Sequence, residues 1–224
     1  MDVTLLIDKP KGITSARVVA LVKKRFKTKV GHTGTLDPLA TGLLILLTGK
    51  RTKEAATFLH MKKTYLVRAL FGTTTTTYDI AGDVVSTCNR TVTREEVEGA
   101  LKSFEGEQLQ VPPAFSAKKL EGKRSYELAR KGVEVNLPAS QVTVYSVRLV
   151  AFDYPNFALE CEVSSGFYVR SLVHDLGQKL GVGATVEEVR RTRVGSYHIE
   201  DATPLDTLLS EVPAVSSAST TSRS

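Results

Sequence analysis

The chain has 224 residues, of which 42% are hydrophobic and 24% charged, and its net charge is +6. This composition is typical of a globular protein with a substantial core, and it excludes a fibrous or wholly disordered chain. No charged start precedes an apolar segment, and no apolar run approaches ~20 residues, so we expect a cytoplasmic protein without a membrane anchor.

The first half of the chain alternates strands and helices. Residues 3–7 form an apolar run that predicts a short strand, and Thr14 with Ser15 can cap the helix that follows. The apolar run 43–47 predicts a buried strand. A phosphate-binding loop is excluded there, because the spacing between Gly42 and Gly49 and the arginine after Lys50 do not fit that motif. Residues 64–75 predict one long strand, with one side formed by Tyr65, Val67, Ala69 and Phe71.

The second half continues in the same mixed way. Thr93 and Glu96 match a capping box that begins a helix. Further elements are predicted as a short helix at 125–131 ended by Gly132, strands at 142–152 and 157–163, and a helix at 168–180 ended by Gly181. Since the order lacks a regular βαβ rhythm, we expect an α+β fold with a mixed, largely antiparallel central sheet flanked by helices.

Residues 1–212 are predicted to form one domain, followed by a disordered Ser/Thr-rich tail at 213–224. Cys88 and Cys161 lie far apart without a CxxC pair, and the four histidines lack ligand spacing, so we expect neither a disulfide framework nor a metal. Basic residues are clustered, as in the run Lys23-Lys24-Arg25. They indicate either a polyanionic partner or a solubilising surface, and charge alone does not decide between these.

Residues 31–42, GHTGTLDPLATG, contain a single carboxylate, Asp37, directly before Pro38. Gly31 and Gly34 permit backbone angles or close approaches that a side chain would forbid. Proline biases the residue before it towards extended geometry, so this loop can fix the direction of a carboxylate. The alternative is an ordinary turn in which Asp37 only caps the next segment, and the residues alone favour that alternative.

Arg170 lies near the start of the helix predicted at 168–180. A cation there opposes the helix dipole and needs an anionic partner, for which an aspartate is the obvious candidate. A bidentate arginine–aspartate pair would hold the acid in its ionised form. The alternative is that Arg170 faces water, and the sequence leaves both open.

Together these segments resemble the bacterial tRNA pseudouridine synthases of the TruB type, which isomerise uridine 55 in the T-loop. The resemblance extends over residues 5–209, and its motifs occur in the family's order. The matching pieces are DKPKGITS from Asp8, GHTGTLDPLATG, Lys63-Thr-Tyr65, the segment 72–82, QVPPAFSAKKLEGKRSYELARKG, SSGFYVRSLVHDLG from Ser164, and Val189-Arg-Arg191.

The resemblance implies an isomerase that flips its uridine out of the stack and needs no cofactor. It implies Asp37 as the nucleophile, Arg170 as its ion partner, and Tyr65 as the residue that stacks on the base and takes part in proton removal. By the same resemblance, substrate or RNA is bound by Lys9, Gly31, His32, Thr33, Gly34, Tyr168 and Val189; Lys23 and Lys24 are added because of their charge.

The chemistry is compatible with a lone acid, because a carboxylate is ionised at neutral pH and can attack or stabilise an electron-poor sugar carbon. Attack at C1′, attack at C6 and elimination to a glycal all stay open. An RNA-binding module without chemistry and a nucleoside hydrolase that uses Asp37 are the competing functions. We expect the protein to be a monomer whose partner is the T-stem and loop of tRNA. We expect it to bind neither a membrane nor a metal.

Two departures from the family pattern stand out. Thr76 occupies a position where the family usually has an acid, although Asp79 and Gly82 of the same segment are kept. A local hydrogen bond or RNA contact is therefore in doubt. Many relatives also carry a small RNA-binding domain of the PUA kind at the C-terminus, and from the Ser/Thr tail we expect this domain to be missing here.

Overall fold

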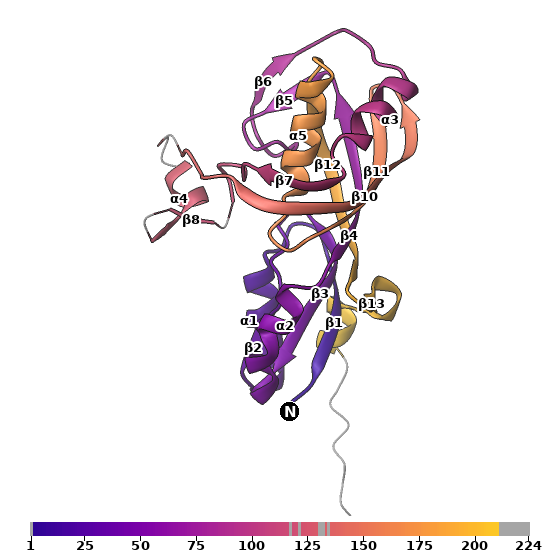
Figure 1. Ribbon diagram of the computed structural model, residues 1–224. Coiled ribbons are helices and arrows are strands. Elements are labelled where there is room, and N and C mark those ends of the chain that lie inside the picture. Colours follow the sequence, from indigo (N-terminus) through magenta and orange to yellow (C-terminus); the bar gives the residue numbers. More distant parts are fainter. Residues whose placement is uncertain (1, 117, 121, 130–132, 134, 211–224) are drawn as a thin grey trace, which may run out of the picture.

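The computed structural model describes residues 2–210, apart from 117, 121, 130–132 and 134. The tail expected at 213–224 and the end of the helix expected at 125–131 lie outside the described residues. The α+β prediction is confirmed, since a ten-stranded mixed sheet runs through the molecule with helices packed against it (Figure 1). The strand order is β14-β1-β3-β12-β4-β11-β10-β7, with β2 paired to β3 and β13 to β12.

One half of the molecule is built around the N-terminal strands (Figure 1). Its elements are β1 (Thr4–Lys9), α1 (Ser15–Phe26), β2 (Val30–His32), β3 (Thr41–Thr48), the 3-10 helix η1 (Gly49–Glu54) and α2 (Ala55–Leu59), joined by the late elements β13 (Tyr197–His198), η2 (Ile199–Asp201), β14 (Thr203–Pro204) and α6 (Leu205–Ser210).

The other half contains the longer strands and helix α5. Its elements are β4 (Lys63–Phe71), β5 (Thr73–Thr75), β6 (Val84–Thr87), α3 (Arg94–Lys102), β7 (Gly106–Gln110), β8 (Lys119–Leu120), β9 (Lys123–Arg124), α4 (Ser125–Ala129), β10 (Ser140–Asp153), β11 (Asn156–Val163), α5 (Val169–Lys179) and β12 (Ala184–Val194). The segment with β8, β9 and α4 projects to one side (Figure 1). Among the described residues, no helix has the length and apolar character needed to cross a membrane.

Local sequence signals explain the two helices that were predicted with caps. The Thr14 hydroxyl accepts a hydrogen bond from the Arg17 amide at 3.0 Å, which satisfies one of the free N–H groups at the start of α1. At α3 the capping box is complete, because the Thr93 side chain accepts from the Glu96 amide and the Glu96 carboxylate accepts from the Thr93 amide. Both helices therefore begin where the sequence predicts.

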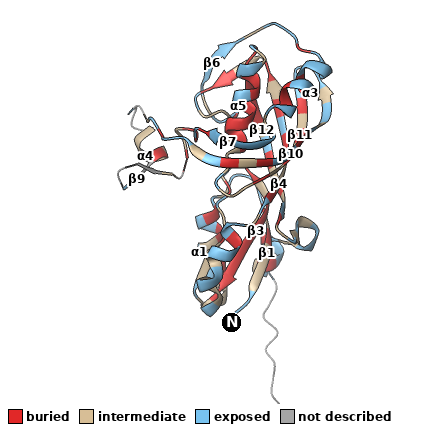
Figure 2. Cartoon of the chain, in the orientation of Figure 1, coloured by how far each residue is buried: buried red, intermediate tan, exposed pale blue. Residues whose placement is uncertain are grey.

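Strand β3 is buried on both faces (Figure 2), which explains its uninterrupted run of leucine and isoleucine. Leu44 and Leu46 pack into the main core, whereas Leu43, Ile45 and Leu47 pack into a second cluster on the opposite face. A strand between two apolar layers has no solvent side on which to place polar residues. The prediction of a buried strand at 43–47 is thus confirmed.

The strand predicted at 64–75 is wrong in its extent. β4 ends at Phe71, and β5 belongs to a separate two-stranded sheet with β6. The strand is interrupted at Gly72, where φ is +84° and an added Cβ would lie 2.9 Å from the Cys88 carbonyl oxygen. The threonines that follow Gly72 have high strand propensity, so the sequence conceals this break.

Strand β12, which was not predicted, joins the two halves of the sheet. It pairs antiparallel with β4 and parallel with β3. At the parallel pairing Gly42 lies opposite Arg191, with φ +97° and with the Arg191 carbonyl oxygen 2.3 Å from an added Cβ. Close approach to β12 therefore requires a glycine at position 42, more strictly than at Gly31 or Gly34, where no Cβ would meet an atom closer than 3.5 Å.

We expect Gly42→Ala to lower the free energy of unfolding by about 3–5 kcal/mol, since it combines a left-handed backbone with a clash against another strand. Gly106→Ala is a matched control, because Gly106 has φ +98° but nothing within 4 Å of its added Cβ. It should cost only about 1–2 kcal/mol in denaturant unfolding. Equal losses in the two variants would show that the strand contact is unimportant.

Candidate active site

A cavity of about 370 Å³ lies between segments from both halves of the molecule. The loop 34–40, the start of β4 and the segment that leads into α5 form its walls. Its charged lining residues are Asp37, Asp79, Lys63, Lys118, Arg170 and Arg191.

The loop that carries Asp37 is held in place by the segment between β1 and α1. The buried Ser15 hydroxyl bonds both the amide and the carbonyl of Leu36, at 2.9 Å each. On the other side of Asp37, the Gly12 amide donates to the Pro38 carbonyl at 2.7 Å. Both neighbours of Asp37 are therefore fixed, so the loop aims the carboxylate. It also contains a turn, because the Ala40 amide donates to the Asp37 carbonyl at 3.1 Å.

Arg170 is buried at the start of α5 and is shared between two carboxylates. Its Nη2 lies 2.7 Å from Asp37 Oδ2, and its Nη1 lies 3.4 Å from Asp79 Oδ2. The two nitrogens also donate to the carbonyls of Phe115 and Thr77, at 2.9 and 3.0 Å. The prediction of an anionic partner is confirmed. The prediction of a bidentate Asp37–Arg170 pair is wrong, because the guanidinium makes one contact to Asp37 and another to Asp79.

Asp79 is a site residue to which the sequence analysis gave no role. Its Oδ1 accepts from the Thr77 hydroxyl at 2.7 Å and from the Ala81 amide at 3.0 Å, which leaves Oδ2 directed at Arg170. The preceding residue, Tyr78, has φ +62° and stacks on His174 of α5 with ring centroids 3.8 Å apart. Because Arg170 and His174 are one helical turn apart, Tyr78 and Asp79 dock against the same face of α5.

The N-terminal end of α5 is positioned by β7. The buried Gln110 accepts from the Tyr168 amide at 2.8 Å and donates to the Tyr168 carbonyl at 3.0 Å. The Ser171 hydroxyl donates to the Val111 carbonyl at 2.8 Å. These bonds fix the helix start from which Arg170 projects. Gln110 belongs to a matching motif, but a single neutral side chain offers no separate signal of its role.

The predicted aromatic residues both line the cavity. Tyr65 lies on β4, opposite Arg191 of β12, and Tyr168 directly precedes α5. Burial raises the pKa of Tyr168, so its phenol is protonated at neutral pH and can donate a hydrogen bond. Val189 lines the same cavity. The structure thus brings together Asp37, Tyr65, Tyr168, Arg170 and Val189 as predicted.

Other predicted residues lie outside the cavity lining. His32 is on β2 opposite Leu46, and the buried Thr33 bonds the Ile45 carbonyl. Gly31 also belongs to β2, whereas Gly34 does line the cavity. Lys23 and Lys24 are exposed in the last turn of α1, where they suit the helix dipole as well as a polyanion.

Lys9 lies beneath the cavity loop and is fully buried. Its ammonium group donates to the carbonyls of Pro10 at 2.9 Å and Ile13 at 2.7 Å, and it lies 3.5 Å from that of Pro38. Burial lowers the pKa of Lys9 to about 8, against the opposing attraction of Asp37. Its position beside Pro38 is that of a residue that supports the loop.

Comparison with known proteins agrees with this geometry. Residues 22–169 match the family model for the N-terminal domain of the TruB family pseudouridylate synthases, and residues 170–220 match that for the tRNA pseudouridylate synthase B C-terminal domain. The fold and the site therefore place the chain among the pseudouridylate synthases, which are isomerases. Within that class it belongs to the TruB family.

Similar proteins include tRNA pseudouridine synthase B of Aquifex aeolicus, which is 49% identical over 94% of this chain and 74% of its own length. The enzyme of the same name from Caldicellulosiruptor saccharolyticus is 43% identical over 92% of this chain and 72% of its own length. Among solved structures, a chain in the crystal structure of a Cbf5–Nop10–Gar1 complex matches with a TM-score of 0.73 and 30% identity. That match covers 92% of this chain and 53% of the other, so this chain spans about half the length of the solved protein.

The buried Lys9 generates a pH prediction. Its pKa is 10.5 in an ordinary setting and about 8 in the fold, so the unfolded chain binds more protons between these values. Stability contributed by position 9 should therefore rise with pH across that window. We expect the free energy of unfolding of the wild type, relative to Lys9→Met, to increase by about 2 kcal/mol between about pH 7.5 and about pH 9.5.

The exposed Lys24→Met variant, measured by the same denaturant titrations, supplies the baseline. A wild-type advantage over Lys9→Met that stayed constant with pH would contradict the buried, proton-releasing state of Lys9.

Proposed function

We propose that the chain is a tRNA pseudouridine synthase that converts uridine 55 in the T-loop to pseudouridine, with Asp37 as the nucleophile. The observation that carries the proposal is the position of Asp37, whose carboxylate is 43% exposed to the cavity and yet paired with Arg170 at 2.7 Å. The names of the relatives, tRNA pseudouridine synthase B, support tRNA as the substrate. We further propose that it acts as a monomer in the cytoplasm.

The reaction conserves all atoms. The bond between C1′ and N1 of uridine breaks, C1′ bonds to C5, the proton on C5 leaves, and N1 gains a proton. A carboxylate can promote the first step by reacting with the nucleotide or by stabilising positive charge on the sugar, as in glycoside hydrolysis. Asp37 is suited to this because its guanidinium partner lies 2.7 Å from Oδ2 and its neighbours fix its direction.

The remaining lining residues have compatible roles. The target base must leave its stack, and the ring of Tyr65 offers a surface that offsets part of the unstacking penalty, about 1–3 kcal/mol per base. We also assign Tyr65 a part in removal of the C5 proton, for which a phenol needs local help to act as a base. Tyr168, kept protonated by burial, can donate to the base or sugar.

The first test of this function is Asp37→Asn, assayed by tritium release from a tRNA transcript labelled at C5 of uridine. We expect at least a 10³-fold loss of rate, because the amide preserves the shape but is not a nucleophile. Asp83→Asn, which alters an exposed acid outside the cavity, should keep full activity.

Equal release from the wild type and Asp37→Asn would remove Asp37 from the mechanism. Release from neither would favour an RNA-binding module, and free uracil on chromatography would instead identify a nucleoside hydrolase.

A second test is Arg170→Lys. One ammonium group cannot reach two carboxylates and two carbonyls at once, so the aim of Asp37 should be lost while the positive charge stays. We expect the single-turnover rate to fall by about 10²-fold or more and RNA affinity to change by about threefold or less. Losses of equal size in rate and affinity would contradict the aiming role.

A further inference from the structure

Lys63 and Arg191 are two buried cations that the reaction described above does not use. Only 6% of Lys63 and 2% of Arg191 is exposed, and both line the cavity. Arg191 lies directly opposite Tyr65 on the neighbouring strand, and Lys63 is two residues before Tyr65. Because side chains alternate along a strand, Lys63, Tyr65 and Arg191 project from the same face of the sheet.

Neither cation has an acidic partner in the described part of the chain. The cavity is lined by four basic and two acidic side chains, and both acids, Asp37 and Asp79, are bound to Arg170. Buried charges in proteins are normally paired, since removal from water is costly unless an opposite charge compensates. Lys63 and Arg191 therefore leave uncompensated positive charge at the wall of the cavity.

The Lys63 ammonium and the Arg191 guanidinium are both held by backbone carbonyls, and each keeps at least one N–H donor without an acceptor among the described residues. The Lys63 ammonium donates to the carbonyls of Leu59 at 2.5 Å and Met61 at 2.6 Å, which leaves one N–H. Arg191 donates from Nε to Leu43 at 2.7 Å and from Nη2 to Gly34 at 3.1 Å. Within the described residues, its Nη1 group has no hydrogen-bond acceptor. The carbonyls fix the two side chains but do not neutralise them.

We propose that Lys63 and Arg191 form an anion subsite that binds a backbone phosphate of the RNA next to the target uridine. The inference rests on the proposed function, because it takes the RNA as the ligand of this cavity. A phosphate accepts several hydrogen bonds and carries the negative charge that the two cations lack. It would anchor the strand beside the flipped nucleotide and so place the sugar against Asp37.

The electrostatics of the two cations agree with this. Burial and, to a smaller extent, the positive charge of the nearby Arg191 together lower the pKa of Lys63 to about 8. An anion between the two cations would relieve their repulsion and favour the charged lysine. If Lys63, at the start of β4, served only to bind the carbonyls of Leu59 and Met61, it would gain nothing from RNA.

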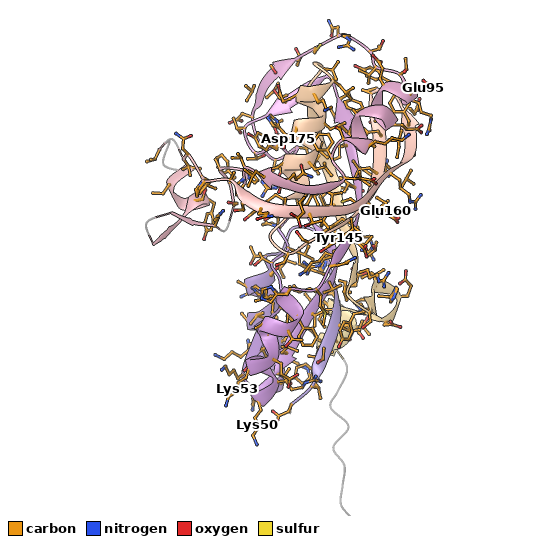
Figure 3. All side chains as sticks on the ribbon, viewed as in Figure 1. Lys50, Lys53, Glu95, Tyr145, Glu160 and Asp175 are labelled. Carbon is orange, nitrogen blue, oxygen red and sulfur yellow. The ribbon has the colours of Figure 1, made fainter. Side chains whose placement is uncertain are left out.

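The test is the salt dependence of binding to a T-arm stem-loop that already carries pseudouridine at the target, so that no turnover occurs. For Lys63→Met we expect about tenfold weaker binding and a slope of log K against log salt that is smaller in magnitude by about 0.7–0.9. Lys53→Met is the matched control, because this substitution removes the same charge from a residue that is exposed at the far end of the N-terminal half (Figure 3). Its slope should equal that of the wild type.

A second measurement avoids any folding defect of the variant. The wild-type chain is titrated with stem-loops in which one phosphate flanking the target is replaced by a neutral methylphosphonate. One of the two replacements should reproduce the reduced slope, and Lys63→Met should be insensitive to that replacement. The proposed subsite is contradicted if neither replacement changes the wild-type slope, or if a folded Lys63→Met variant has the same slope as the wild type.

These outcomes are separate from the fate of the proposed function. If the wild type forms no pseudouridine in the uridine stem-loop, the proposed function fails whatever the slopes are. If it forms pseudouridine and the slopes do not change, only the phosphate subsite fails.

Discussion

The buried guanidinium of Arg170 is the contact on which the site depends. A charge removed from water is stable only when opposite charge and hydrogen-bond acceptors surround it, and Arg170 has two carboxylates and two carbonyls. Asp37 comes from the N-terminal half of the molecule, whereas Asp79 and Arg170 come from the other half. One side chain therefore holds both walls of the cavity together and directs a half-exposed acid into it.

This arrangement has an electrostatic consequence for the rest of the cavity. Because Arg170 takes both acids, the charge left on the walls is positive, and it is carried by Lys118 and by the buried Lys63 and Arg191. A negatively charged polymer is attracted to such a surface, while the carboxylate of Asp37 is shielded by its own partner, Arg170. In the proposed function, fixing the nucleophile and binding the RNA are thus parts of one charge distribution.

Local sequence patterns identified the elements whose signals are themselves local. The cap at Thr14, the capping box at Thr93 and the apolar strand 43–47 depend on neighbouring residues, and all three are confirmed. Strand β12 was not predicted, because bulges beside Val186 and Arg191 shift its alternation of buried and exposed residues. The end of β4 at Gly72 was not predicted, because it is set by contact with Cys88, which is distant in sequence.

The sequence by itself determined the family, the candidate nucleophile Asp37 and the need of Arg170 for an anion, since motif order and helix position are readable along the chain. Only the tertiary structure decided that Arg170 is shared between Asp37 and Asp79, that Gly42 admits β12, and that no acid of the described residues pairs with Lys63 or Arg191. Pairing of charges and close approach of strands are set by distances between segments remote in sequence, and no local pattern encodes those distances.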